Sequence, residues 1–259
     1  MENFERMKDV LRVRSLVQIG FAGSYKCDLL LYLARTVLAA GKRVAIVDAA
    51  EEDIWSYSVP TYLDNKVVTY GDVDIYLGCN TAETYEAIEF NNYDIVFVDF
   101  GFNKNMSYYM GLCDKIILVT NLEKNNVLKL REYIKAFTNS EVFNGKGSAD
   151  NSADGEKVEV KTKKDAIKIY LDVVKSKINS QYTDTLLDID EKLNIVMEYI
   201  VEFDEINYKH RIESQYNDLI RFNKLSKAYK YLLVDLIENS TDLDRKSIEK
   251  ALKKAERGK

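Results

Sequence analysis

The segment from Ser15 to Ala50 constrains the fold more than any other stretch, because it predicts one βαβ unit. An apolar run from Leu16 to Ile19 is short enough and β-branched enough to be a buried parallel strand. Apolar residues then recur at helical spacing from Leu29 to Ala40, and Gly41 follows, where a helix needs a left-handed C-terminal residue. A parallel strand followed by a covering helix is expected.

The second strand of this unit is predicted from Val44 to Val47, and it ends on Asp48. Between the first strand and the helix the chain breaks at Gly20 and Gly23. This glycine turn lies at the carboxyl end of a strand, which is where open α/β sheets bind their ligands.

The glycine turn nearly matches the phosphate-binding loop G-x-x-x-x-G-K-[ST]. In that loop, backbone N–H groups surround the phosphates, the lysine adds charge and the hydroxyl binds magnesium. Gly20 and Lys26 match the pattern, whereas Tyr25 and Cys27 do not. The alternative is a doubly wound protein that carries glycines in this turn without binding a nucleotide.

Later segments repeat the alternation of strand and helix. The order is KRVAIVDA, then YDIVFVDFG with Asp99 ending a strand, then CDKIILVTNLEKNNVLKLREYI. From about Leu16 to Glu238 this order resembles the ParA/MinD family of P-loop ATPases, including pilus-positioning members of the TadZ/CpaE type. The resemblance implies an α/β fold, with a mostly parallel doubly wound sheet and helices on both faces. It also implies a single P-loop NTPase-like domain over residues 1–259.

The resemblance implies a site for ATP and Mg²⁺ at the carboxyl edge of the sheet. Magnesium would be held through its water shell by Asp48 and Asp99, although Asp99 could instead cap the turn before Gly101. Asp172 stands where the family has an asparagine that contacts the base. The residues implied in nucleotide binding are Gly20, Gly23, Ser24, Lys26, Cys27, Asp28, Asp172 and Phe203.

The chain departs from the family at several of these positions. Phe21 replaces a lysine that reaches across the family's dimer, and Ala50 stands where the second acid of D-x-D would follow Asp48. Two functions therefore remain open. One is a degenerate localisation or assembly factor, for example positioning pilus or secretion machinery, with ATP hydrolysis weakened or lost. The other is an active dimeric ATPase in partitioning or spatial positioning.

Partners follow from the resemblance and from charge. A homodimer is expected through the face that bears the phosphate loop, with Phe21 and Tyr25 in the contact, together with protein partners of a larger assembly. A formal net charge of −5 argues against a protein that coats DNA through a basic surface.

A cytoplasmic location is expected, because no stretch approaches 18 consecutive apolar residues and residues 1–14 lack an apolar signal core. The three cysteines lie far apart, which suits a reducing compartment and argues against zinc. The tail, residues 241–259, predicts a charged helix whose thin apolar stripe favours a solvated helix over peripheral contact with the inner face of the membrane. The stripe is Ile248, Leu252 and Ala255.

The remaining elements are predicted from periodicity and composition. Trp55 lies in a loop-like segment, where packing at the surface is favoured over covering a ligand. A polar insertion is expected at about 138–163, and His210 is given a packing role. Strands are expected at 67–70, 73–77, 93–99, 116–120, 166–173 and 195–200, and helices at 82–89, 127–137 and 226–238, the last with Ala228, Tyr231, Leu232 and Leu236 inward.

Overall fold

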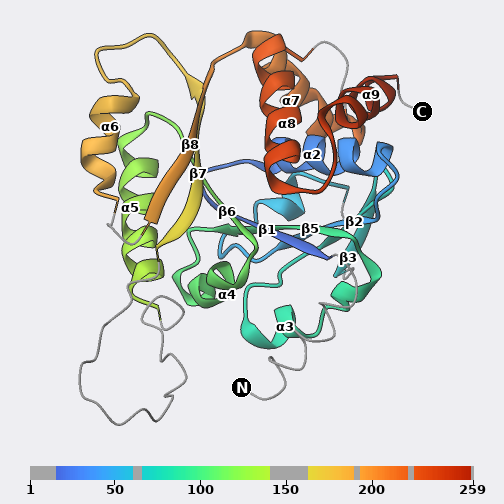
Figure 1. The fold of residues 1–259 in the computed structure, drawn as a ribbon, viewed down its shortest axis with the longest axis horizontal. Coiled ribbons are helices and arrows are strands. Elements are labelled where there is room, and N and C mark those ends of the chain that lie inside the picture. The colour runs from blue at the N-terminus through green and yellow to red at the C-terminus, as the bar shows by residue number, and fades with distance from the viewer. Residues whose placement is uncertain (1–15, 61–65, 141–162, 190–192, 221–224, 258–259) are drawn as a thin grey trace.

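The computed structural model describes residues 16–60, 66–140, 163–189, 193–220 and 225–257. Residues 1–14 and most of the polar insertion predicted at 138–163 lie outside these ranges. All described strands join one eight-stranded sheet in the order β3-β4-β2-β5-β1-β6-β7-β8 (Figure 1). That residues 1–259 form a single domain stays a prediction.

The strand bounds agree with the predicted apolar runs to within a few residues. The strands are β1 (Val17–Gly23), β2 (Val44–Asp48), β3 (Val67–Tyr70), β4 (Val73–Tyr76), β5 (Ile95–Gly101), β6 (Lys115–Thr120), β7 (Lys164–Val173) and β8 (Leu193–Glu202). The helices are α2 (Cys27–Ala39), α3 (Ala82–Glu86), α4 (Ser107–Leu112), α5 (Lys124–Thr138), α6 (Ser180–Leu187), α7 (Glu205–Asn217), α8 (Lys227–Ser240) and α9 (Arg245–Glu256).

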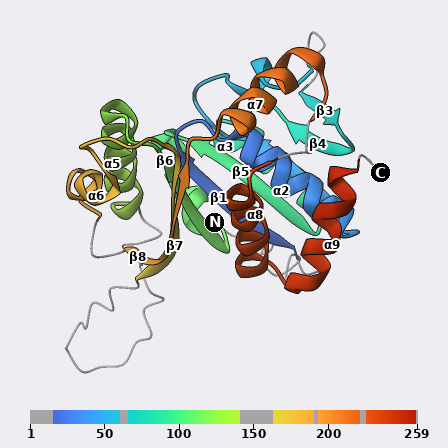
Figure 2. The same ribbon diagram turned by 90° about the horizontal axis from the view of Figure 1, so that it is seen from above.

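The sheet is parallel apart from the hairpin of β3 and β4. β1 lies between β5 and β6, and its residues pair with both neighbours. Helices cover both faces: α2, α8 and α9 contribute to one apolar core, and α3, α4, α5 and α6 contribute to the other. Figure 2 shows α2, α8 and α9 together on one side, with α5 and α6 apart from them. The predicted α/β fold, with a mostly parallel doubly wound sheet, is confirmed.

β1 is longer than predicted. It was expected to end at Ile19 and break at Gly20, but the strand continues to Gly23. The reason is that Gly20, Phe21 and Ala22 each have a partner on β5 and on β6, so that two ladders hold this stretch extended. Gly41, in contrast, takes the predicted left-handed conformation with φ +90°.

The inward face of α8 also differs from the prediction. Leu232 and Leu236 are buried as predicted, whereas Ala228 and Tyr231 are exposed. Its buried residues are Tyr229, Leu232, Leu233, Val234, Leu236, Ile237 and Ser240. Three helices, α4, α6 and α7, were not predicted.

The charged tail is not a solvated helix. Its apolar stripe is buried, with Ile248, Leu252 and Ala255 in the same core as α2, against which α9 packs. The lysines lie on the opposite, exposed face. None of the described helices has the length and apolar character needed to cross a membrane.

Truncating this stripe should destabilise the fold. We expect Ile248→Ala to lower the free energy of unfolding by about 3 kcal/mol, because a fully buried isoleucine leaves a cavity between α9 and α2. Urea unfolding followed by circular dichroism measures it. Lys250→Ala, on the exposed face of the same helix, should change stability by less than about 0.5 kcal/mol. Equal effects of the two variants would contradict the packing of α9.

Candidate functional site

Lys26 is the centre of the candidate site, and its ammonium is enclosed by the protein. It stands at the N-cap of α2 and is 1% exposed. The Nζ atom lies 2.7 Å from Oδ1 of Asp99 and donates to the carbonyl oxygens of Gly23 and Ser24, each at 3.0 Å. Because an ammonium has three donors, these contacts use its full capacity.

Asp99 is bound from several sides. Its Oδ1 atom also accepts from the backbone N–H of Gly101 at 2.9 Å, as expected of a turn-capping aspartate. The indole N–H of Trp55 donates to Oδ2 at 3.0 Å. Trp55 was expected to pack at the surface, but it is fully buried, because its ring is part of the apolar core that contains α2. The pair of Lys26 and Asp99 is therefore closed off from solution.

Asp48 lies beside Asp99 at the carboxyl edge, since the two residues are paired in register on β2 and β5. Its Oδ1 atom accepts from the backbone N–H of Ala50 at 3.2 Å. Burial, and next the charge of Asp99, raise the pKa of Asp48 to about 7. Asp48 and Asp99 thus come together as predicted, while their role toward magnesium stays a prediction.

The raised pKa makes stability depend on pH. Folded Asp48 titrates near 7 and unfolded Asp48 near its ordinary value, so this group lowers stability progressively as pH rises between those values and by a constant amount above them. Asp48→Asn removes the titration. We expect its stability relative to wild type to increase by about 2 to 3 kcal/mol from pH 5 to pH 8. Denaturant unfolding at both pH values tests this, and a pH-independent difference would contradict the shifted pKa.

Both glycines of the turn, Gly20 and Gly23, are explained by close neighbours within the protein. A Cβ on Gly20 would lie 2.5 Å from the sulfur of Met110, and one on Gly23 would lie 1.8 Å from the carbonyl oxygen of Val119. The next residue, Ser24, donates its backbone N–H to that same oxygen at 2.9 Å. The close approach that these glycines permit is thus to α4 and β6.

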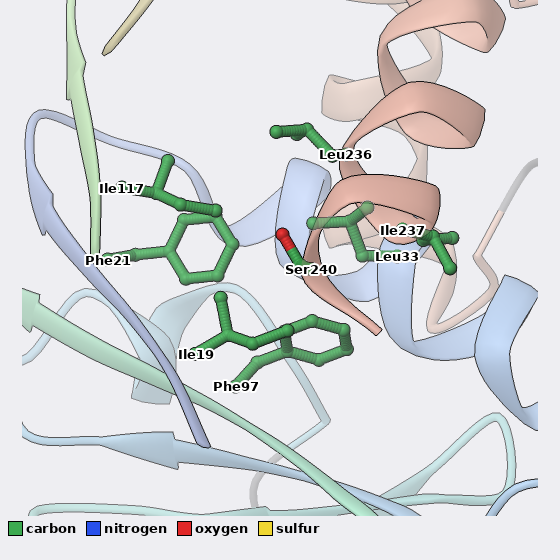
Figure 3. Close-up of a pocket in the computed structure, with 8 residues that line it drawn as sticks. All are labelled: Ile19, Phe21, Leu33, Phe97, Ile117, Leu236, Ile237 and Ser240. Carbon is green, nitrogen blue, oxygen red and sulfur yellow. The ribbon is translucent and has the colours of Figure 1, made fainter. Parts of the chain in front are cut away.

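Phe21 faces the core and not a partner. It is fully buried and lines a small apolar pocket with Phe97, Leu33 and Leu236 (Figure 3), which has no room for a water molecule. In the extended strand Ile19 and Phe21 share one face, and α8 covers that face. The expected dimer contact through Phe21 is therefore wrong: the longer β1 turns this side chain inward.

Helix α7 covers Tyr25. The Tyr25 hydroxyl accepts from the side-chain amide of Gln215 at 3.0 Å, and the guanidinium of Arg211 lies over its ring, 5.4 Å from the centroid. Arg211 also donates to Oδ2 of Asp172 at 2.8 Å. Asp204 caps α7 by accepting from the backbone N–H of Asn207. Arg211 thus links Tyr25, in the predicted phosphate-binding loop, to Asp172 near the end of β7.

The other predicted site residues lie around this helix and the start of α2. Asp172, with φ +54°, sits in an irregularity of β7, and Phe203 is exposed with its ring 5.6 Å from that of Tyr208 on α7. Burial, above all, raises the pKa of Asp28 and of the Cys27 thiol. Their role in nucleotide binding stays a prediction.

Sequence reasoning missed Trp55, Arg211 and Gln215 as members of this region. The capping residue Asp204 followed by a helical stretch was the available signal for α7, but the helix is mostly polar and its apolar face is weak. Within the described ranges, no three His, Cys, Asp or Glu side chains are grouped as metal ligands would be.

No protein family model matches the chain, and no curated protein matches it. Similar solved structures include a ParA family ATPase from Chlorobium tepidum TLS, at 14% identity and a TM-score of 0.47, covering 90% of this chain and 98% of that one. Another is a protein described as a plasmid partition protein from Borrelia burgdorferi B31 bound to AMPPNP, at 13% identity and a TM-score of 0.46, covering 92% of this chain and 98% of that one. A third is a McdA–ATP complex from Cyanothece, at 11% identity and a TM-score of 0.43, covering 95% of this chain and 96% of that one. With TM-scores below 0.5, these similarities assign neither function nor site residues to this chain, whose fold follows from its own sheet order.

Proposed function

We propose that this chain is a degenerate ParA/MinD-like protein that acts as a localisation or assembly factor without hydrolysing ATP. The order of motifs along the chain supports the family, and the buried pair of Lys26 and Asp99 supports the loss of hydrolysis. Phosphoryl transfer depends almost entirely on positioned charge and metal. In this chain, the lysine that would meet phosphate is held by a carboxylate 2.7 Å away.

Several of the groups that a triphosphate would contact have partners within the protein in this conformation. Phosphate loops offer free backbone N–H groups, whereas here residues 20–23 belong to the sheet ladder and Ser24 donates to Val119. Cys27 stands where the magnesium hydroxyl would be, and its side chain is in the core. These residues do not fit magnesium-bound ATP.

The state of the cysteines bears on the cellular compartment in which the protein works. The three cysteines are free and buried, as in proteins of a reducing compartment. We therefore propose that the protein works in the cytoplasm, through contacts with other protein components of an assembly.

The test is nucleotide binding to the purified chain, with and without magnesium. We expect no calorimetric signal and no rise in Tm at millimolar ATP, which corresponds to a Kd weaker than about 1 mM. Reversing two substitutions together, Tyr25→Gly with Cys27→Thr, should not create tight binding while Lys26 stays paired with Asp99.

The alternative is an active dimeric ATPase, and one observation favours it. Lys26, Asp48 and Asp99 converge at the carboxyl edge of the sheet, so release of Lys26 from Asp99 would place charged groups where a P-loop enzyme has them. Magnesium-dependent binding in the micromolar range, with ATP turnover that the Asp99→Asn variant lacks, would establish this alternative and overturn the proposal.

A further inference from the structure

Helix α7 lies on the outside of the molecule and is held there by polar side chains (Figure 2). The two residues that it buries, Asn207 and His210, are both polar. The side-chain amide of Asn207 donates to the hydroxyl of Ser226 at 3.1 Å, and its oxygen accepts from the backbone N–H of Ser226 at 2.9 Å. Arg211 and Gln215 make the contacts described above. The polar side of α7 is therefore the side that faces the protein.

The apolar side chains of α7 form a row on the opposite side. Tyr208, Ile212 and Tyr216 are spaced by four residues, so that each is the neighbour of the next along the helix. They are 41%, 39% and 84% exposed. The ring of Phe203, itself exposed, lies 5.6 Å from the ring of Tyr208. Helical spacing and this ring contact join the four side chains into one surface, which we call the α7 stripe.

The orientation of α7 is the reverse of what a surface helix usually shows, because such a helix normally turns its apolar row to the core. Here the row cannot turn inward without breaking the hydrogen bonds of Asn207, Arg211 and Gln215. A contiguous row of large apolar side chains that the fold holds in solvent is typical of a surface that binds another molecule.

Acidic side chains predominate beside the α7 stripe. Glu205 precedes the row by one turn and Asp218 follows its end, and both are exposed. In the part of the chain that the structure describes, neither residue takes part in an ion pair. The exposed lysine of the helix, Lys209, lies 3.7 Å from Glu213, which offsets its charge. The charge around the stripe thus complements a basic partner.

We propose that the α7 stripe binds an amphipathic helix of another protein, one whose apolar row is flanked by Lys and Arg. A row at i, i+4 and i+8 is the ridge that packs into the grooves of a second helix in the commonest class of helix packing. The row from Tyr208 to Tyr216 is roughly 12 Å long, which is about two turns of such a helix. Tyrosine suits this contact, since its ring is apolar and its hydroxyl can still form a hydrogen bond.

Charge argues against two other occupants. A helix that lies on a membrane carries Lys and Arg beside its apolar face, whereas the α7 stripe lies beside acids. A second copy of this chain would bring Glu205 and Asp218 of both protomers close together, whichever way the two helices run, and these like charges repel. A basic segment of a different protein is free of both difficulties.

The inference rests on the proposed function for its purpose, because an assembly factor works through contacts with other proteins. It needs no nucleotide, so the two are tested separately. ATP turnover by the wild-type chain would overturn the proposed function and leave the α7 stripe as a binding surface. Failure of the stripe to bind would leave the nucleotide measurements unchanged.

A fluorescent model peptide tests the chemistry of the surface. The probe is an amphipathic helical peptide of leucine and lysine, and its counterpart has glutamate at every lysine position. In anisotropy titrations without nucleotide, we expect the leucine–lysine peptide to bind the wild-type chain with a Kd in the micromolar range. The leucine–glutamate peptide should bind at least tenfold more weakly.

Substitutions place the binding on the stripe. Ile212→Gln/Tyr216→Gln should weaken binding of the leucine–lysine peptide at least tenfold. Tyr57→Gln is the matched control, because Tyr57 is 82% exposed away from α7, and it should leave binding unchanged. Circular dichroism checks that each variant is folded, as expected when only outward-facing side chains are replaced.

A second pair of variants tests the charge. Glu205→Gln/Asp218→Asn should weaken binding of the leucine–lysine peptide at least threefold, and asparagine can keep the positive φ of residue 218. Glu83→Gln/Glu89→Gln makes the same change in net charge at exposed positions elsewhere and should have no effect.

Several results would overturn the proposal. They are no binding at millimolar peptide, equal binding of the two peptides, and equal binding by the stripe variant and the Tyr57 variant. Two more would assign the stripe to another occupant. One is binding to vesicles of phosphatidylcholine and phosphatidylglycerol that the stripe variant loses, and the other is self-association in analytical ultracentrifugation that the same variant loses.

Discussion

The Gly23→Ala variant should fail to fold cooperatively, with a loss of more than about 4 kcal/mol in the free energy of unfolding. Two causes act together. Gly23 has φ +120°, which residues with a side chain rarely adopt, and a Cβ there would lie 1.8 Å from the carbonyl oxygen of Val119. That oxygen belongs to the backbone of β6, so only a shift of the sheet could relieve the overlap. Thermal and urea unfolding of the free protein measure the loss.

Gly41→Ala is the matched control. Gly41 also has a positive φ, of +90°, but no atom lies within 4 Å of the position where a Cβ would be. It should therefore cost only about 1 kcal/mol. The comparison also bears on function. A glycine that exists to let phosphate approach would accept alanine in the free protein, and a stable Gly23→Ala variant would contradict our account of the motif.

Lys26→Met should lower the free energy of unfolding by about 3 to 5 kcal/mol, because it leaves the carboxylate of Asp99 buried without its partner. Trp55 is the one tryptophan of the sequence and donates to Asp99, so its fluorescence should report the change at the site.

The control for Lys26 is an ion pair of equal length at the surface. Lys104 lies 2.7 Å from Glu132, and both side chains are at least half exposed. Lys104→Met should cost less than about 1 kcal/mol. Equal losses of stability in the two variants would mean that the pair of Lys26 and Asp99 is not buried in solution. The proposal that this chain does not hydrolyse ATP would then lose its main support.

Sequence patterns were sufficient for most of the sheet. β2 follows its predicted apolar run and ends on Asp48, as a buried parallel strand does. β3 also has the predicted bounds, but it is an antiparallel edge strand with alternating burial, and the turn pair Gly71-Asp72 marks its end. The end of β1 could not be found this way. In the sequence alone, Gly20 and Gly23 indicate the end of a strand. They continue β1 in the structure because neighbouring strands pair with them.

The candidate site was predictable in part. That Asp48 and Asp99 would converge follows from parallel strands ending at one edge of a sheet. The residues that enclose the site were not predictable. Trp55 and Arg211 come from segments whose sequence does not indicate that they contact Asp99 and Asp172. Only tertiary packing decides whether such a lysine faces ligand or carboxylate.

Helix α2 is covered by helices from the end of the described chain, and this affects how the chain folds during synthesis. The apolar face of α2 packs against α8 and α9. These two helices lie within residues 227–256, about 200 residues after α2 in the chain. At translation rates of about 5 to 20 residues per second, that face waits roughly 10 to 40 seconds for its partners. A core that depends on such distant contacts forms slowly. Nascent chains of this protein should therefore be clients of ribosome-associated chaperones until the last two described helices have emerged.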